Sequence, residues 1–190
     1  MHDPYVAELQ ACPDRRAVAN CLLKKSMTFA GAPMGNVQIL NRKDDVLEIV
    51  AQSGFGQNFL HFFRAVKADG QSVCARALRR GETVAVEDVA TVNMPPSYHA
   101  VFAEAEVRAV QSLPLIASDG TLVGMLSTHF HQAVKLDAAD LLTMRRQATL
   151  AANRLVMMPA IGPESPGAAP AHRGPSKESR HAWSKLVTGD

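Results

Sequence analysis

One cysteine and two histidines have the greatest potential for chemistry. Cys74 lies at the start of a predicted helix, and a helix N-terminus can lower the pKa of a thiol. A reactive thiol would favour redox or nucleophilic chemistry, and a small buried residue at a helix–sheet contact is the alternative. His129 and His131 are two apart on a predicted strand, so they point to one face. Two ligands do not complete a metal site, so we predict neither a metal nor a cofactor.

A group of aromatic residues, Phe55, Phe59, Phe62 and Phe63, is the second feature. These side chains either line a pocket or pack in the core. Later polar residues could complete a pocket, because they flank or lie on a predicted interior strand. The candidate ligand-binding residues are Phe59, Phe63, Cys74, Tyr98, Phe102, Arg108, Gln111 and His129.

Among the candidates, Tyr98 and Phe102 could close the pocket from a later predicted helix. If Arg108 or Gln111 points into it, that side chain would orient a ligand, and Arg108 would favour an anion. The sequence has no phosphate-binding Gly-rich loop and no Gly-x-Ser-x-Gly element, so we predict no catalytic residues.

Composition excludes several classes of protein. The 190 residues carry a net charge of +2 without a run of one sign, so we expect no nucleic-acid partner. No apolar stretch approaches the ~18–20 residues of a membrane helix, and the first residues do not resemble a signal peptide. The three cysteines form no even framework. We therefore expect no membrane association and a cytoplasmic location.

The predicted elements alternate between helices and hairpins. Helical spacing predicts helices over residues 14–28, 72–78 and 137–156 and a weak helix before residue 105, and alternation predicts strands over 34–41, 46–51, 83–86, 109–116 and 122–130. Asp14, Ser72 and Asp137 are the expected N-caps, and Gly81 the expected left-handed C-cap. Hairpin-linked strands favour an antiparallel sheet, and long terminal helices favour coverage of one face, an α+β fold. We predict an N-terminal extension (1–13), a folded domain (14–157) and a disordered, Pro/Gly-rich tail (158–190).

Five stretches together resemble the GAF domain family of bacterial signalling proteins. The first two are residues 35–40, Gly-Asn-Val-Gln-Ile-Leu, and residues 49–55, Ile-Val-Ala-Gln-Ser-Gly-Phe. The other three are residues 84–89, Val-Ala-Val-Glu-Asp-Val, residues 107–115, Val-Arg-Ala-Val-Gln-Ser-Leu-Pro-Leu, and residues 120–130, Gly-Thr-Leu-Val-Gly-Met-Leu-Ser-Thr-His-Phe. Their order and spacing carry the resemblance. It implies a six-stranded antiparallel sheet with terminal helices on one face and a pocket roofed by short helices and loops on the other.

The resemblance also implies three functions. The leading one is a non-catalytic module that senses a small molecule or regulates signalling. Some stand-alone members reduce free methionine sulfoxide, so a thiol-dependent reductase using Cys74 is an alternative. A degenerate interaction module with a closed pocket is the third. Tyr98-His99 lacks the adjacent cysteine of chromophore-binding members, and the Asn-Lys-Phe-Asp-Glu motif of cyclic-nucleotide-binding members is absent.

Assembly follows from the last predicted helix. Its apolar stripe consists of Leu141, Met144, Ala148, Ala151 and Leu155, with Leu142 and Leu150 at its sides. Pairing such helices with the N-terminal ones would form a four-helix bundle, so we predict a homodimer, unless the stripe packs on the chain's own sheet. The resemblance adds a separate kinase or regulator as an output partner.

Overall fold

A computed structural model describes residues 3–67, 70–135 and 137–159 of the chain. The elements in chain order are α1 (Pro4–Ala11), α2 (Arg15–Ala30), β1 (Met34–Asn41), β2 (Val46–Ser53), α3 (Gln57–Phe63), β3 (Ala65–Lys67), α4 (Val73–Arg80), β4 (Val84–Val86), the 3₁₀ turn η1 (Val89–Thr91), α5 (Pro96–Glu104), β5 (Ala109–Ile116), β6 (Leu122–Phe130) and α6 (Ala138–Val156). The tail predicted for 158–190 lies, from residue 160 on, outside the described residues.

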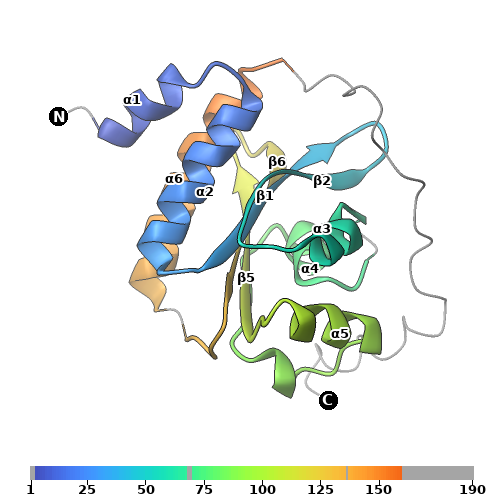
Figure 1. The fold of residues 1–190 in the computed structure, drawn as a ribbon. Coiled ribbons are helices and arrows are strands. Elements are labelled where there is room, and N and C mark those ends of the chain that lie inside the picture. The colour runs from blue at the N-terminus through green and yellow to red at the C-terminus, as the bar shows by residue number, and fades with distance from the viewer. Residues whose placement is uncertain (1–2, 68–69, 136, 160–190) are drawn as a thin grey trace.

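The strands form one six-stranded sheet in the order β3-β2-β1-β6-β5-β4. Every pairing is antiparallel, so the predicted α+β class and sheet are confirmed. Helices α2 and α6 lie side by side against one face, the helical face, and the short helices α3, α4 and α5 lie on the other, the roofed face (Figure 1). No helix in the described part of the chain is long and apolar enough to cross a bilayer.

Side chains of the predicted type begin the main helices. Asp14 accepts a hydrogen bond from the backbone N–H of Ala17 at 2.8 Å, and Ser72 accepts one from that of Ala75 at 3.0 Å. Asp137 caps α6 in the same way. These bonds satisfy donors that have no partner within the helix, which confirms the predicted caps.

The helical face is closed by the chain itself. Met144, Ala148, Ala151 and Leu155 of α6 are at most 1% exposed and pack in one core with α2 and the central strands. This corrects the interface predicted along that stripe: its side chains fill the chain's own core and are not available to a second copy. Leu142, on another side of α6, is 70% exposed.

Helix α1 is an element that the sequence pattern did not predict. It lies within the predicted extension, where Asp3 caps its first turn. Tyr5 and Leu9 are buried in the core of the helical face. The guanidinium of Arg154 in α6 donates to the backbone carbonyls of Leu9 and Cys12. The segment before α2 is therefore part of the packed domain.

Candidate functional site

A row of polar side chains crosses the middle of the roofed face. Asn36 of β1 pairs in register with Ser127 of β6, and Ser127 pairs with Ser112 of β5. Because paired residues of neighbouring strands share a face, the three side chains lie next to one another. The Ser112 and Ser127 hydroxyl oxygens are 2.8 Å apart. We call these residues, together with Cys74 and His129, the polar cluster.

Cys74 joins the cluster from the first turn of α4. Its sulfur lies 3.4 Å from Ser112 Oγ and 3.2 Å from Ser127 Oγ. Burial raises the pKa of the Cys74 thiol, and the two hydroxyls offset that effect only in part. The position at a helix start therefore does not produce the lowered pKa considered from the sequence, because loss of solvent outweighs the helix dipole.

His129 is the second titratable member, on β6 two residues after Ser127. Burial lowers the pKa of His129 to about 3, so the ring is neutral near pH 7. The Phe55 and Phe59 rings meet it edge to face, with centroids 4.9 Å and 5.5 Å away. His131 lies exposed beyond the end of β6, where its Nδ1 is 2.9 Å from the carbonyl of Glu106. The two histidines thus do not form a pair.

Several buried polar atoms at this face have no partner among the described residues. Within the described residues, Asn36 Oδ1, Gln38 Oε1 and His129 Nδ1 are buried without a hydrogen bond. The Gln38 side chain does donate through Nε2 to the carbonyl of Phe63. An unpaired buried polar atom costs about 1–3 kcal/mol, so a ligand's donor would be stabilising at the two amide oxygens, and His129 Nδ1 can donate or accept according to its tautomer.

An aromatic roof, Phe55, Phe59, Phe63, Tyr98 and Phe102, covers the polar cluster. All five side chains are at most 9% exposed. Phe55 and Phe59 stack with centroids 3.9 Å apart, and Phe63 stacks on Phe102 across α3 and α5 at 5.8 Å. The structure thus brings together six predicted site residues on one face: Phe59, Phe63, Cys74, Tyr98, Phe102 and His129.

Two predicted site residues lie elsewhere. Arg108 forms a surface ion pair with Asp88, 2.7 Å between Nη2 and Oδ2, and its side chain is 51% exposed. The hydrogen bond to Arg108 lowers the pKa of the Asp88 carboxyl. Gln111 points to the helical face, where its Nε2 lies 3.8 Å from the sulfur of Met144. The position of Arg108 removes the predicted anion-binding group from the site, and the position of Gln111 removes a predicted ligand-orienting side chain.

The sequence prediction missed Asn36, Ser112 and Ser127. For Ser127 strand parity is the signal that could have found it, because side chains two apart on a strand share a face. Ser127 is two residues before His129, and Ser112 is the next residue after the misplaced Gln111. In the described part of the chain, no group of three His, Cys, Asp or Glu residues could hold a metal ion.

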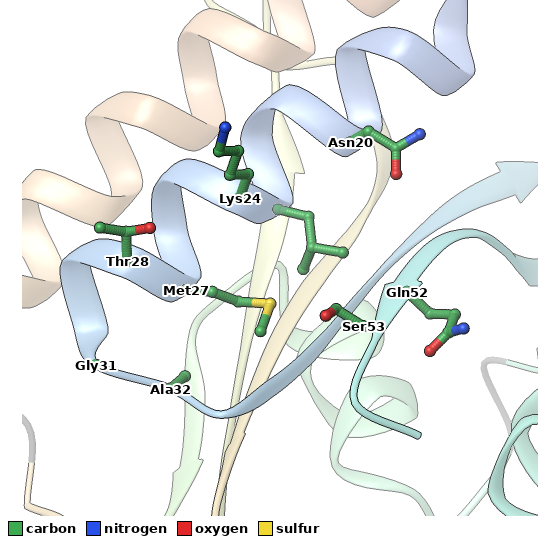
Figure 2. Close-up of a pocket in the computed structure, with 9 residues that line it drawn as sticks. Asn20, Lys24, Met27, Thr28, Gly31, Ala32, Gln52 and Ser53 are labelled. Carbon is green, nitrogen blue, oxygen red and sulfur yellow. The ribbon is translucent and has the colours of Figure 1, made fainter. Parts of the chain in front are cut away.

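A groove of about 500 Å³ lies outside the roofed face, beside α2 (Figure 2). It is lined by Asn20, Leu23, Lys24, Met27, Thr28, Gly31, Ala32, Gln52 and Ser53. Lys24 is the ionisable member of that lining, and the hydroxyls of Thr28 and Ser53 have no carboxylate or histidine beside them in it to act as a base. The groove therefore offers a surface for contact and no constellation for chemistry.

Comparison with known proteins agrees with this fold. The GAF domain family model matches residues 12–156. A GAF domain of a phosphoenolpyruvate-protein phosphotransferase from Coxiella burnetii is similar in structure, with a TM-score of 0.66 and 13% identity over 80% of this chain and 89% of that one. No curated protein matches the sequence significantly.

Two further solved structures share the fold. The free methionine-R-sulfoxide reductase of Neisseria meningitidis, solved with its substrate, has a TM-score of 0.65 and 20% identity over 80% of this chain and 84% of that one. The PixJ GAF domain of Thermosynechococcus elongatus, in its blue-light-absorbing form, has a TM-score of 0.58 and 20% identity over 75% and 86% of the chains. At these identities the likeness shows the fold alone.

Proposed function

Because this chain belongs to the GAF domain family, whose domains serve sensing or regulation in signalling, we propose that it is a non-catalytic sensor of a small molecule. The ligand binds against the polar cluster beneath the aromatic roof. The observation that carries this proposal is the set of unpaired, buried polar atoms under that roof, the acceptors Asn36 Oδ1 and Gln38 Oε1 and the ring nitrogen His129 Nδ1.

The electrostatics of the polar cluster favour an uncharged ligand. Cys74 has a raised pKa and His129 a lowered one, so both are neutral near pH 7. Arg108 pairs with Asp88 at the surface. A charged ligand would lose its hydration without a counter-charge from the cluster, which is unfavourable. The unpaired acceptors match a molecule with N–H or O–H donors, and the aromatic roof matches a flat one.

Binding requires the aromatic roof to move. Phe59 and Phe63 are on α3, seven residues long, and Tyr98 and Phe102 are on α5, nine residues long. Helices this short depend on packing for their stability. The closed aromatic roof and an open one that admits a ligand therefore differ by few contacts. A ligand that binds the open state better shifts the population toward it.

The reductase alternative finds less support in the positions of the cysteines. Cys74 is 8% exposed with a raised pKa, which keeps it as a weakly nucleophilic thiol. Cys12 and Cys21 pack against the core of the helical face, on the other side of the sheet from Cys74. A thiol mechanism with a second, resolving cysteine would need two of them on one face.

The output of the sensor is a second copy of the chain or a separate kinase or regulator, reached through α2 and α6. Both helices carry large exposed apolar side chains, Phe29 at 42% and Leu142 at 70%. Light scattering at micromolar concentration tests the homodimer. A dimer mass that falls with Leu142→Asp supports this surface, and a monomer mass for the wild type contradicts it.

Thermal-shift screening of uncharged, donor-bearing metabolites tests the ligand proposal. At 100 times Kd a ligand stabilises the fold by about 2.7 kcal/mol, which raises the melting temperature by roughly 5–10 °C. Ser127→Ala removes a hydroxyl from the polar cluster, and we expect it to weaken binding several-fold. Thr128→Val is the matched control, because Thr128 is the next residue on β6 and faces the opposite side.

The two variants also define the contradicting results. Equal loss of binding in Ser127→Ala and Thr128→Val would mean that the ligand is not held by the polar cluster. The absence of any shift across the panel, with no co-purified molecule in native mass spectrometry, would favour the closed interaction module. Turnover of free methionine sulfoxide that is lost in Cys74→Ser would favour the reductase.

A further inference from the structure

Two cysteines outside the candidate site lie against each other where α1 meets α2. Cys12 follows the last residue of α1, and Cys21 lies in the second turn of α2. Cys12 is near enough to Cys21 to help raise the pKa of the Cys21 thiol, so the two thiols are neighbours. Glu8 of α1 accepts from both: its carbonyl lies 3.3 Å from Cys12 Sγ and its carboxylate 3.8 Å from Cys21 Sγ.

Both thiols are free and partly exposed. A small oxidant can therefore reach them, whereas Cys74 is buried on the other face of the sheet. Burial, followed by the nearby Cys12 and Glu8, raises the pKa of Cys21 to about 11. Cys21 is therefore held as a thiol at neutral pH and reacts slowly, which suits a site that responds to sustained oxidation.

We propose that Cys12 and Cys21 form a reversible redox modification site, in which a disulfide ties α1 to α2. The oxidant is a low-molecular-weight disulfide. One protein thiolate attacks it and releases one small thiol, leaving a mixed disulfide. The second protein thiolate then attacks the protein sulfur of that bond and releases the second small thiol. Each protein thiol gives up one proton, and two electrons pass to the oxidant.

The disulfide would fix the packing of α1. In the thiol form α1 is held by the buried side chains of Tyr5 and Leu9 and by Arg154, which donates to backbone carbonyls at its C-terminal end. The Asp3–Arg146 ion pair and the Lys25 ammonium over the Tyr5 ring add to these contacts, but α1 is only eight residues long, so we expect it to open locally at smaller cost than α2 or α6. A disulfide between Cys12 and Cys21, which are nine residues apart in the chain, would prevent that opening, because it joins the end of α1 directly to α2.

Oxidised glutathione applied to the full, reduced chain tests the proposal. We expect a mass loss of about 2 Da and a fall in titratable thiols after unfolding from three to one. Trypsin cleaves at Arg15 and Arg16, so the peptides that contain Cys12 and Cys21 should be recovered as one linked species. Hydrogen exchange of the α1 amides should slow severalfold in the oxidised protein.

Matched variants make the result specific. Cys74→Ser should form the same bridge, whereas Cys12→Ser and Cys21→Ser should give only a mixed disulfide with glutathione. Three remaining thiols, glutathione adducts without a bridge in the wild type, or disulfide-linked dimers on a non-reducing gel would overturn the proposal. A bridge that leaves α1 exchange unchanged would overturn the fixing of α1.

Discussion

The two faces of the sheet bury polar groups to a similar extent but are covered in different ways. On the helical face, Gln111 and Thr128 lie buried under α2 and α6, which are 16 and 19 residues long. On the roofed face, Ser112 and Ser127 lie buried under helices of seven to nine residues. Long helices packed along their whole length open rarely, and short ones open at less cost.

This difference supports the proposal that the two faces have different tasks. A polar atom under α6 is out of reach of any ligand, so Thr128 Oγ1 without a partner is a stability cost alone. The same kind of atom beneath the aromatic roof becomes accessible when the roof moves. Burial alone does not identify a site, and the mobility expected of the covering element decides whether a buried polar group can be used.

The largest expected effect tests the rigidity of the helical face. Leu155 is fully buried, and Leu155→Ala should lower the free energy of unfolding by about 2–5 kcal/mol, because the cavity cannot be refilled. Leu142→Ala, on the same helix but 70% exposed, should change it by about 0.5 kcal/mol or less. Urea unfolding followed by circular dichroism measures both. Similar losses in the two variants would contradict the packing of α6.

The next effect is a pH dependence that belongs to the roofed face. The folded-state pKa of His129 is lowered to about 3, below its ordinary value near 6.5, so the unfolded chain binds the extra proton between these values. The stability that depends on a neutral His129 is therefore fully present above the ordinary histidine pKa. The free energy of unfolding then falls as the pH decreases toward 3, by up to about 1.4 kcal/mol per pH unit. His129→Gln should show a flatter profile in the same range. Parallel profiles for wild type and variant would contradict a buried, neutral His129.

Removal of two neighbouring hydroxyls should change the stability of the fold in opposite directions. Ser127→Ala removes the partner of Ser112 and Cys74 and should destabilise the fold by about 1 kcal/mol. Thr128→Val removes a hydroxyl that has no partner among the described residues, and should be neutral or stabilising. Melting temperatures of both variants decide this. Destabilisation by Thr128→Val would mean that its hydroxyl has a partner, such as a buried water.

The smallest effect is expected at Arg108. This side chain is half exposed and paired with Asp88 at the surface, so Arg108→Ala should leave ligand binding unchanged and shift the melting temperature by about 2 °C or less. The shift should shrink further in high salt. A marked loss of ligand affinity would return Arg108 to the site and contradict an uncharged ligand.

Much of the fold was predictable because local signals agreed with the packing. Caps at Asp14 and Ser72 and the alternation of the strands placed the main elements. Helix α1 escaped prediction because eight residues with a weak apolar periodicity fold only by packing on α2 and α6. Strand β3, three residues long, is defined by its pairing with β2 and by no local signal.

The candidate site was predictable in its aromatic half and not in its polar half. Four predicted aromatic residues meet on one face, because large apolar side chains are stabilised by burial and pack against one another in the core. The error at Gln111 concerns the face of the sheet on which its side chain lies. Adjacent residues of a strand point to opposite faces, so Gln111 lies on the helical face and Ser112 lies on the roofed face, where Gln111 was expected. Ser112 carries no distinctive signal until its neighbours across the sheet are known.

Helix α6 has a consequence for the order in which the molecule folds. Its Arg154 contacts residues 9–12, and its buried side chains share a core with α1 and α2, more than a hundred residues earlier in the chain. During synthesis the apolar faces of the sheet and of α2 exist before the helix that covers them. The final core can form only once α6 has emerged from the ribosome, so folding is expected to be slow and to depend on protection of that surface until then.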